Sequence, residues 1–392
     1  MRNFSWLVAL AAMLTIHMLP AARAQTATTD FQFTSGLESA TAPFTPYANL
    51  VIVDVSVDGA QPLPFALDTG IGQTVIDSDV ARALGIAVLV RHGGCGGRIA
   101  NDLTLAWRGV RVYNESADIA PLSALWPVLG VRIDGIIGGD VLSRFVVRID
   151  YARRAVTLID PAGYPPAERG RSIPIVIRDG EPFVACALGS NGKPPIVASL
   201  KIDTGSIDAV SLASSFVRAH GLFPAGAKHV AVPAGAGVDA RGYARLASIG
   251  FKGVTLTGPI VAYSERTTAG AIGARILSRF TVDIDYAHKQ LTLGPNGTVS
   301  SSFPFDASGL YVVAAGDRAG AFRVAAVVPG SPAADAGLRA GDAVMSVDGR
   351  KTTAMSLDKL RRLLEQTGQT TRLGIVSAGK PKQVSIRLRE LL

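Results

Sequence analysis

The chain has 392 residues, which is too many for one ordinary hydrophobic core and predicts two or three domains. Hydrophobic residues make up 48% of the sequence and charged residues 18%, which excludes an intrinsically disordered chain. The formal net charge is +8, but no run of arginine or lysine is interleaved with aromatic residues. The basic balance therefore predicts a solvated surface and no nucleic acid partner.

The chain opens on a segment with the features of a secretory leader. Arg2 precedes an apolar run over 6–14, and Ala22-Arg23-Ala24 is a small-x-small cleavage site. We expect residues 1–24 to be a signal peptide cleaved near Ala24, and the mature protein to be secreted or periplasmic. No later segment has the about 18 uninterrupted apolar residues of a membrane span, so no transmembrane anchor is expected in the mature chain.

The next part of the chain is predicted to consist of short strands. An apolar run over 49–57 ends at Asp58-Gly59, which favours a tight hairpin turn. The return strand, 63–67, continues directly into Asp68-Thr69-Gly70. A short helix is expected over 78–84, because Gly85 is a usual helix-ending residue.

A second copy of this pattern follows. Asp203-Thr204-Gly205 lies 135 residues after Asp68-Thr69-Gly70 (203 − 68), and Ala271-Ile272-Gly273 lies 135 residues after Ile136-Ile137-Gly138 (271 − 136). Self-similarity at one fixed offset is the signature of a duplicated structural unit. We therefore expect two tandem copies of one β-rich lobe.

The pattern changes after the second copy. Strands are expected over 322–328 and 343–347, and Ser356 is predicted to cap a helix with leucines on one face. Two alternating strands close the chain. The predicted domains are lobe 1 over 25–165, lobe 2 over 166–298, and a mixed α and β domain over 299–392.

The duplicated motif supplies the groups that a proton-sharing carboxylate pair needs. Two acids a few ångströms apart cannot both ionise cheaply, so Asp68 and Asp203 would hold one proton between them. The ionised acid can activate a water while the protonated acid donates to a scissile carbonyl. A threonine can fix each loop through hydrogen bonds, and a glycine permits a sharp turn and a close approach.

The doubled motif and its apolar-apolar-glycine triplets resemble the retropepsin-like and pepsin-like aspartic proteases over about 42–295. The resemblance implies a mainly β fold of two tandem acid-protease β-barrel lobes. It implies an aspartic endopeptidase, acting on peptides or proteins without a cofactor, with Asp68 and Asp203 as the catalytic dyad. The implied supporting residues are Thr69, Gly70, Ile137 and Gly138 in lobe 1, and Thr204, Gly205, Ser206, Ile272 and Gly273 in lobe 2.

One departure from the family leaves an alternative open. The family usually has serine or alanine after the glycine, which Ser206 matches and Ile71 does not. Ile71 cannot hydrogen-bond its aspartate, so the lobes could instead form a catalytically inactive, peptide-binding scaffold. A further alternative is pairing of lobes between chains. The glycine-rich tips at 93–97 and 235–242 are either flaps over a bound peptide or plain loops.

The tail resembles a PDZ domain of the type appended to bacterial periplasmic proteases. The resemblance rests on Pro329-Gly330-Ser331-Pro332-Ala333, Ala336-Gly337-Leu338 and Gly341-Asp342. It implies that a peptide adds to a sheet edge and that backbone N–H groups hold its terminal carboxylate. The implied binding residues are Gly309, Leu310 and Tyr311, where Tyr311 replaces a common glycine.

The cysteines and histidines do not indicate a metal site. Cys95 and Cys186 lie in different repeats, and either one disulfide or two separate thiols fits an oxidising compartment. The histidines show no ligand spacing with each other or with the cysteines, so no metal is expected.

Overall fold

The computed structural model describes residues 30–34, 36–91, 97–164, 171–190, 192–223, 228–232, 240–316 and 320–392. The predicted signal peptide, Cys95 and most of both glycine-rich tips lie outside these residues. Within the described part of the chain, no helix is long and apolar enough to cross a membrane.

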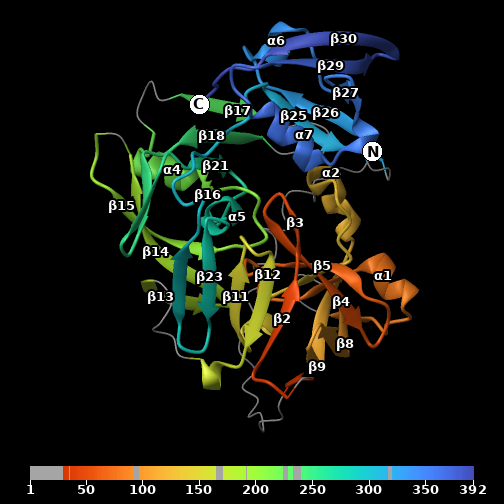
Figure 1. Ribbon diagram of the computed structural model, residues 1–392, viewed down its shortest axis with the longest axis vertical. Helices are drawn as coiled ribbons and strands as arrows, with labels where there is room; N and C mark the ends of the chain where they lie inside the picture. The colour runs from red at the N-terminus through yellow and green to blue at the C-terminus, as the bar shows by residue number, and fades with distance from the viewer. Residues whose placement is uncertain are drawn as a thin grey trace.

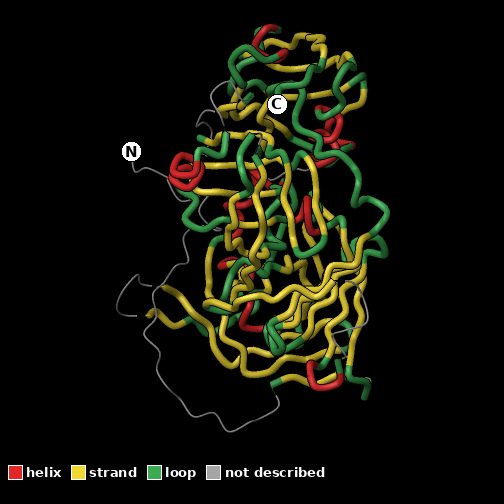
Figure 2. The backbone as a smooth tube through the Cα atoms, turned by 90° about the vertical axis from the view of Figure 1, so that its left-hand side faces the viewer, coloured by secondary structure: helices red, strands yellow, loops and turns green. Residues whose placement is uncertain are grey.

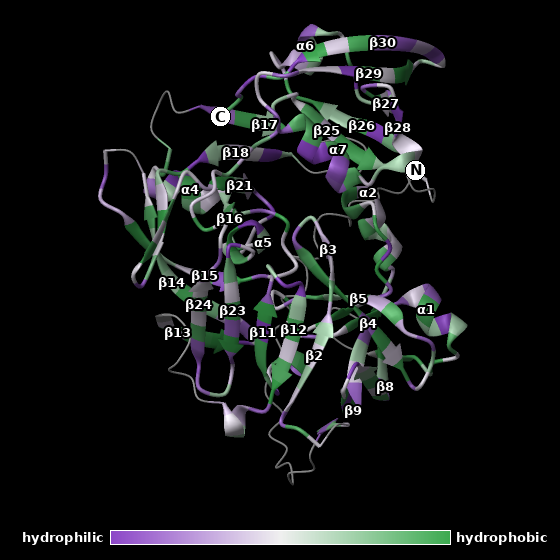
Figure 3. Ribbon diagram, in the orientation of Figure 1, coloured by the Kyte–Doolittle hydropathy of each residue, from purple (hydrophilic) through white to green (hydrophobic). Residues whose placement is uncertain are grey.

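The protein is mainly β, as the sequence predicts, with three sheets and a few short helices (Figure 1). Figure 2 shows the strands of the two lobes stacked below the small C-terminal sheet. Apolar residues recur along the strands of all three sheets (Figure 3), which is typical of strands that bury a face in a core.

Lobe 1 contains a closed barrel. Its strand order is β9-β6-β10-β5-β4-β8, and β8 also pairs with β9, so the ring has no free edge. The predicted hairpin turn is confirmed, since Asp58 and Gly59 both have positive φ angles (49° and 78°). The strands of this sheet are β1 (Phe31–Phe33), β3 (Thr45–Tyr47), β4 (Leu50–Val57), β5 (Leu63–Leu67), β6 (Val75–Asp77), β7 (Leu89–Arg91), β8 (Gly97–Trp107), β9 (Val110–Ala120) and β10 (Gly135–Ile137).

Short helices connect the strands of lobe 1. The predicted helix is confirmed as α1 (Ser78–Ala83), which begins where the Asp77 side chain accepts the N–H groups of Asp79 and Val80. The other helical segments are η1 (Leu122–Leu125), α2 (Trp126–Leu129), α3 (Gly139–Leu142) and η2 (Pro161–Gly163).

Lobe 2 repeats this arrangement as part of a larger sheet. Its order is β17-β18-β21-β16-β22-β15-β14-β13, with β19 beside β14 and β20 beside β19. The elements are β13 (Arg171–Arg178), β14 (Glu181–Gly189), β15 (Ile196–Ile202), β16 (Val210–Ala213), α4 (Ser214–His220), β17 (His229–Val232), β18 (Arg241–Arg245), β19 (Ser248–Phe251), β20 (Val254–Thr257), β21 (Ile260–Ser264), β22 (Ala271–Ile272), α5 (Ala274–Leu277), β23 (Phe280–Asp285) and β24 (Gln290–Pro295).

Six strands of the same sheet join the lobes in the order β13-β24-β23-β11-β12-β2, where β11 is Val146–Asp150, β12 is Ala155–Ile159 and β2 is Ser39–Pro43. The central pair, β11 and β23, are equivalent strands of the two repeats. Arg148 lies opposite its own repeat equivalent, Asp283, and donates to both of its carboxylate oxygens at 2.8 and 2.7 Å. An approximate two-fold axis therefore passes between these residues.

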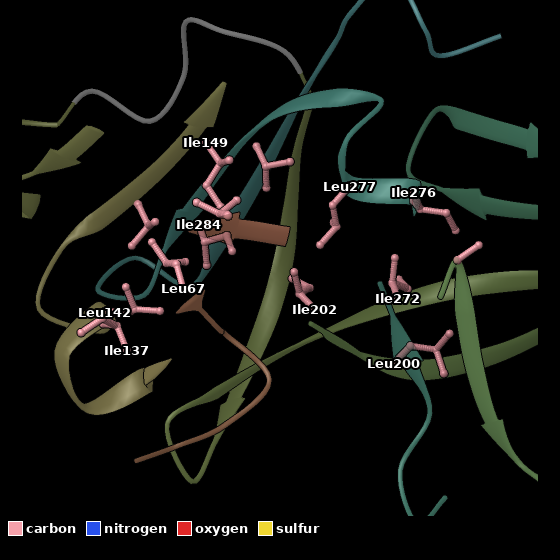
Figure 4. Close-up of a cluster of buried hydrophobic side chains, with 14 of the residues drawn as sticks. Leu67, Ile137, Leu142, Ile149, Leu200, Ile202, Ile272, Ile276, Leu277 and Ile284 are labelled. Atoms are coloured by element: carbon pink, nitrogen blue, oxygen red, sulfur yellow. The ribbon is translucent and has the colours of Figure 1, made fainter. Parts of the chain in front are cut away.

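The main core is built from repeat-equivalent residues of both lobes. Figure 4 shows branched aliphatic side chains from β5, β10, α3 and β11 packing close to those from β15, β22, α5 and β23. Four equivalent pairs belong to this cluster: Leu67 and Ile202, Ile137 and Ile272, Leu142 and Leu277, Ile149 and Ile284. The core is therefore shared between the lobes, so the strand ends that carry Asp68 and Asp203 are held on one packed body.

The C-terminal domain has its own sheet and core. The order is β25-β26-β27-β29-β30, with β28 beside β27. The predicted cap at Ser356 is confirmed, because its side chain accepts the Lys359 N–H, and Ser331 caps α6 in the same way by accepting the Ala334 N–H. The elements are β25 (Leu310–Ala314), β26 (Phe322–Val327), α6 (Pro332–Asp335), β27 (Ala343–Val347), β28 (Arg350–Lys351), η3 (Thr352–Ala354), α7 (Leu357–Leu364), β29 (Thr370–Ser377) and β30 (Lys380–Arg387).

The C-terminal domain packs directly on the lobes. Helix α2 of lobe 1 contacts strand β25, and Trp126 packs against the core of the C-terminal domain (Figure 1). Tyr47 Oη accepts the Asp358 N–H at 3.3 Å, and Leu392 is buried in the core shared by the lobes. The limits predicted for the three domains stay predictions.

We predict that Arg148→Ala destabilises the junction of the lobes. The substitution leaves the Asp283 carboxylate, whose side chain is 4% exposed, without its guanidinium, at a cost of about 3 kcal/mol in the free energy of unfolding. Urea denaturation followed by circular dichroism measures this change. Arg153→Ala is the matched control, because Arg153 is 87% exposed and lies 4.0 Å from Asp150. Equal effects of the two substitutions would contradict the prediction.

Candidate active site

Two equivalent strands deliver the aspartates to the junction of the lobes. β5 ends at Leu67 and β15 at Ile202, each one residue before its aspartate. β10 pairs in parallel with β5, and β22 pairs in parallel with β15. The Asp68 N–H donates to Ile137 O at 3.0 Å, and the Asp203 N–H donates to Ile272 O at 2.9 Å. The apolar triplets therefore lie directly behind the two aspartate loops.

The two threonines bind the opposite loops reciprocally. Thr69 Oγ1 donates to Ile202 O at 2.6 Å, and Thr204 Oγ1 donates to Leu67 O at 2.8 Å. Each hydroxyl also accepts the backbone N–H of the other threonine, at 3.0 and 3.2 Å. Both threonines are fully buried, so these four bonds satisfy polar groups that water cannot reach.

The glycines that follow the threonines let the carboxyl groups approach. A Cβ atom on Gly70 would lie 2.4 Å from Asp203 Cγ, and a Cβ atom on Gly205 would lie 2.1 Å from Asp68 Oδ2. Any other residue at either position would push the facing aspartate away. Each glycine therefore packs on the aspartate of the other lobe.

The triplet glycines also occupy positions without room for a side chain. A Cβ atom on Gly138 would lie 2.5 Å from the backbone carbon of Gln73, and one on Gly273 would lie 2.3 Å from Asp208 O. The Gly138 N–H donates to Thr74 Oγ1 at 3.1 Å, and the Gly273 N–H donates to Ala209 O at 3.0 Å. These contacts hold the turns that follow the aspartates.

The two carboxyl groups share a hydrogen bond and have different environments. Burial raises the pKa of Asp68, whereas the N–H groups of Gly70, at 2.7 Å, and of Gly205 lower it. Burial, followed by the charge of Asp68, raises the pKa of Asp203 well above its usual range. Burial therefore disfavours ionisation of both carboxyl groups, and the pair favours one proton shared between them.

The residues after the glycines differ between the lobes, as the sequence predicts. Ile71 is 6% exposed and packs in an apolar cluster with Leu129 and Ile136. Ser206 does not act on its aspartate through its hydroxyl, which accepts the Asp208 N–H at 3.4 Å; its backbone N–H lowers the pKa of Asp203 instead. The asymmetry at this position therefore acts through packing rather than through a side-chain bond to Asp203.

The aspartates open into a cavity of about 200 Å³ between the lobes and the C-terminal domain. Lobe 1 contributes an apolar wall, lobe 2 a more polar one, and strand β25 contributes Tyr311. The wall residues used below are Leu125, Leu129 and Ile133 from lobe 1, and Arg241 and Tyr263 from lobe 2.

The cavity also contains a buried lysine that the sequence analysis did not select. Lys201 lies on β15 and is 6% exposed, and its Nζ donates to Gly70 O at 2.5 Å. The signal for it was available, because the equivalent residue of the first repeat is Ala66. Only the strand before Asp203 carries a charged residue among its apolar residues, and this difference between the repeats identifies Lys201 as a candidate site residue.

The predicted peptide-binding residues of the tail lie at the start of β25. Gly309 has φ +79°, and a Cβ atom on it would lie 2.1 Å from Ser331 Oγ. The Gly309 N–H donates to Asp306 Oδ1, and the Leu310 N–H donates to Ser308 Oγ at 3.0 Å. An internal carboxylate, whose pKa burial raises to about 7, thus occupies the predicted carboxylate-binding loop. The role of Gly309, Leu310 and Tyr311 stays a prediction.

The remaining candidate groups add no further chemistry to this site. Cys186 is a buried thiol near Ala198 O, and burial raises its pKa to about 12. In the described ranges, no group of three or more His, Cys, Asp and Glu residues could hold a metal ion.

Comparison with known protein families identifies two domains in the chain. Residues 53–141 match the aspartyl protease family model, and residues 323–376 match the PDZ domain model. The chain contains an aspartyl protease domain and a PDZ domain. The aspartyl protease match includes Asp68 and Gly138 and ends before lobe 2, so the relation of Asp203 to that family rests on the repeat.

The chain is also similar to the periplasmic pH-dependent serine endoprotease DegQ of Escherichia coli (strain K12). The two sequences are 33% identical over 115 residues, which are 29% of this chain and 24% of DegQ. The match therefore spans about a quarter of that relative. So short a match does not carry the serine chemistry in the name of DegQ to this chain.

We predict that Thr204→Val loosens the two aspartate loops while keeping the shape of the side chain. The Thr69 N–H and Leu67 O would lose their partner in a dry site, which costs about 2 kcal/mol in the free energy of unfolding. Urea denaturation measures the loss. Thr41→Val is the control, because the bond from Thr41 Oγ1 to Thr157 Oγ1 is exposed, and it should change stability little. A smaller effect at Thr204 than at Thr41 would contradict this account.

A separate prediction concerns the contact between Gly205 and Asp68. Gly205→Ala should displace the Asp68 carboxyl, and in the peptide-cleaving role proposed below such a displacement reduces turnover by about 100-fold or more. Peptide cleavage measures the loss. Gly297→Ala serves as the control, since no atom lies within 4 Å of a Cβ atom there. Full activity of Gly205→Ala would contradict this prediction, because cleavage would then not depend on the position of the Asp68 carboxyl.

Proposed function

We propose that this protein is an aspartic endopeptidase that hydrolyses peptide bonds with a water activated by Asp68 and Asp203. The observation that carries the proposal is the reciprocal packing of the two loops. Each threonine bonds the opposite strand, and each glycine lies against the opposite aspartate. This arrangement brings together two acids from distant parts of the chain and gives them one proton to share.

The two carboxyl groups would divide the acid and base roles. Ionised Asp68 accepts a proton from the water as the water oxygen attacks the scissile carbonyl carbon. Protonated Asp203 donates its proton to the carbonyl oxygen, which gives a neutral tetrahedral diol. Asp68 then donates its proton to the leaving nitrogen and Asp203 regains one from a hydroxyl, so the dyad returns to its starting state as the C–N bond breaks.

The cavity favours an extended peptide with apolar side chains. Leu125, Leu129 and Ile133 offer apolar surface on the lobe 1 side, and Arg241 and Tyr263 offer polar groups on the lobe 2 side. Tyr311 of the PDZ domain lines the same cavity. We therefore propose that the PDZ domain forms one wall of the substrate cleft.

The PDZ domain itself supports peptide binding, and the predicted site is the start of β25 with Gly309, Leu310 and Tyr311. Asp306 engages the Ser308 and Gly309 N–H groups, so a peptide carboxylate would have to displace it. Arg361 Nη2 also donates to Val312 O at 3.0 Å, a carbonyl on the strand to which a peptide would add. We propose that this site binds peptide termini weakly unless the Asp306 loop opens.

The location of the protein is part of the same proposal. The leader-like segment over 1–24 and the periplasmic location in the name of DegQ both support export. We propose that the mature protein begins near residue 25 and acts in the periplasm or outside the cell.

The test is cleavage of a mixed peptide library by the mature protein and its Asp68→Asn and Asp203→Asn variants. Each substitution removes one proton-transferring acid and should lower the rate about 1,000-fold. Because the pKa of Asp203 is raised well above its usual range, Asp203 stays protonated at a pH where a free carboxyl has ionised. Activity should therefore extend above the pH range of free carboxyl groups and fall once Asp203 ionises.

Three outcomes would contradict the proposal. Cleavage that survives either substitution would exclude the dyad. Inhibition of wild-type cleavage by a fluorophosphonate, which reacts with activated serines, would favour serine chemistry. Peptide binding without cleavage from acid to neutral pH would favour the inactive scaffold.

A further inference from the structure

Lys201 connects the two aspartate loops from one side only. It lies on β15, two residues before Asp203, and its Nζ crosses to the loop of lobe 1, where it donates to Gly70 O at 2.5 Å. Gly70 is the residue that packs on Asp203 and whose N–H bonds Asp68. The lysine thus binds a residue that touches both members of the dyad.

The ammonium group is held in a dry and charged environment. Its side chain is 8% exposed, and Glu181 Oε1 of β14 lies 3.3 Å from Nζ. A buried cation of this kind is costly unless it is paired and hydrogen-bonded, and here both partners are present. The equivalent position in lobe 1 is Ala66, so the repeat does not require a lysine for folding of the strand.

We propose that Lys201 is a positioning residue of the dyad, which fixes the Gly70 peptide and places a positive charge beside Asp68 and Asp203. The inference rests on the proposed function, since it assigns a role within that site. The hydroxyl and glycine contacts of the loops are two-fold symmetric, whereas this charge comes from lobe 2 alone.

The charge of Lys201 acts on every acid around it. It lowers the pKa of Asp68, of Asp203 and of Glu181, opposing the burial that raises each of them. Asp179 raises the pKa of Glu181, and burial together with the charges of Asp68 and Glu181 raises the pKa of Tyr286. The titratable residues Asp208, Arg241 and Tyr263 line the same cavity as the dyad. Removal of the lysine charge should therefore move both titrations of the dyad to higher pH.

Two substitutions at Lys201 separate the charge from the hydrogen bond. Lys201→Gln keeps a donor without the charge, and Lys201→Met removes both. We expect both limbs of the pH–rate profile to shift upward by about one pH unit or more in each variant. Only Lys201→Met should also show a rate loss at its new optimum, because the Gly70 peptide is then unheld. Lys193→Gln is the matched control: Lys193 Nζ donates to Gly221 O at 3.0 Å on the exposed surface, and its loss should leave the profile unchanged.

Glu181→Gln provides a test of opposite sign that keeps Lys201. It removes a negative charge near the dyad, so the profile should move to lower pH. A purely structural role for the lysine would give no such opposed shifts. If Lys201→Met does not fold, as judged by circular dichroism, Lys201→Gln, which keeps a donor at this position, decides the question. An unchanged profile in Lys201→Gln, or a downward shift, would overturn the inference.

A direct titration separates this inference from the proposed function. Carbon-13 NMR of labelled aspartate carboxyls in the wild type and in Lys201→Gln reports the dyad without any cleavage. An upward pKa shift in a protein that cuts no peptide would support the role of Lys201 and refute the endopeptidase. Cleavage by the wild type with unshifted carboxyls in Lys201→Gln would refute the role of Lys201 and leave the endopeptidase standing.

Discussion

The structure depends on holding two carboxyl groups close together at a buried site, where their negative charges would repel each other. Their mutual repulsion and their burial both oppose ionisation, so the loops must be fixed by bonds that do not involve the carboxyls themselves. The buried threonine network does this, because Thr69 and Thr204 each bond the strand of the other lobe. The sheet that joins β11 to β23 and the shared aliphatic core then keep the two loops in register.

The duplication explains the framework of the site, and its departures explain the asymmetry. Gly70 and Gly205 make the same contact from opposite sides. In contrast, the other lobe has Ala66 at the position of Lys201 and Ser206 at the position of Ile71. Lys201 adds a charge on the lobe 2 side, and Ile71 adds apolar packing on the lobe 1 side. Two carboxyls related by a two-fold axis would be electrically identical, and these differences make their surroundings unequal.

The PDZ domain is part of the same body rather than a separate module on a linker. Helix α2 contacts β25, and its first residue, Trp126, packs against the core of the PDZ domain. The nearby Leu125 and Leu129 line the cavity at the aspartates. One short segment of lobe 1 thus touches both β25, the proposed peptide-binding strand, and the cavity at the aspartates. The PDZ domain can therefore shape this cavity through its contact with lobe 1.

The sequence by itself determined the repeat, the mainly β fold, the PDZ domain and the pairing of Asp68 with Asp203. Each of these depends on local patterns or on a fixed offset, which a single chain displays directly. Only the tertiary structure decided which neighbours these residues meet. Lys201 reaches Gly70, 131 residues away (201 − 70), and Tyr311 lines the cavity at Asp203, 108 residues away (311 − 203), because packing joins distant segments, and periodicity carries no information on contacts of that range.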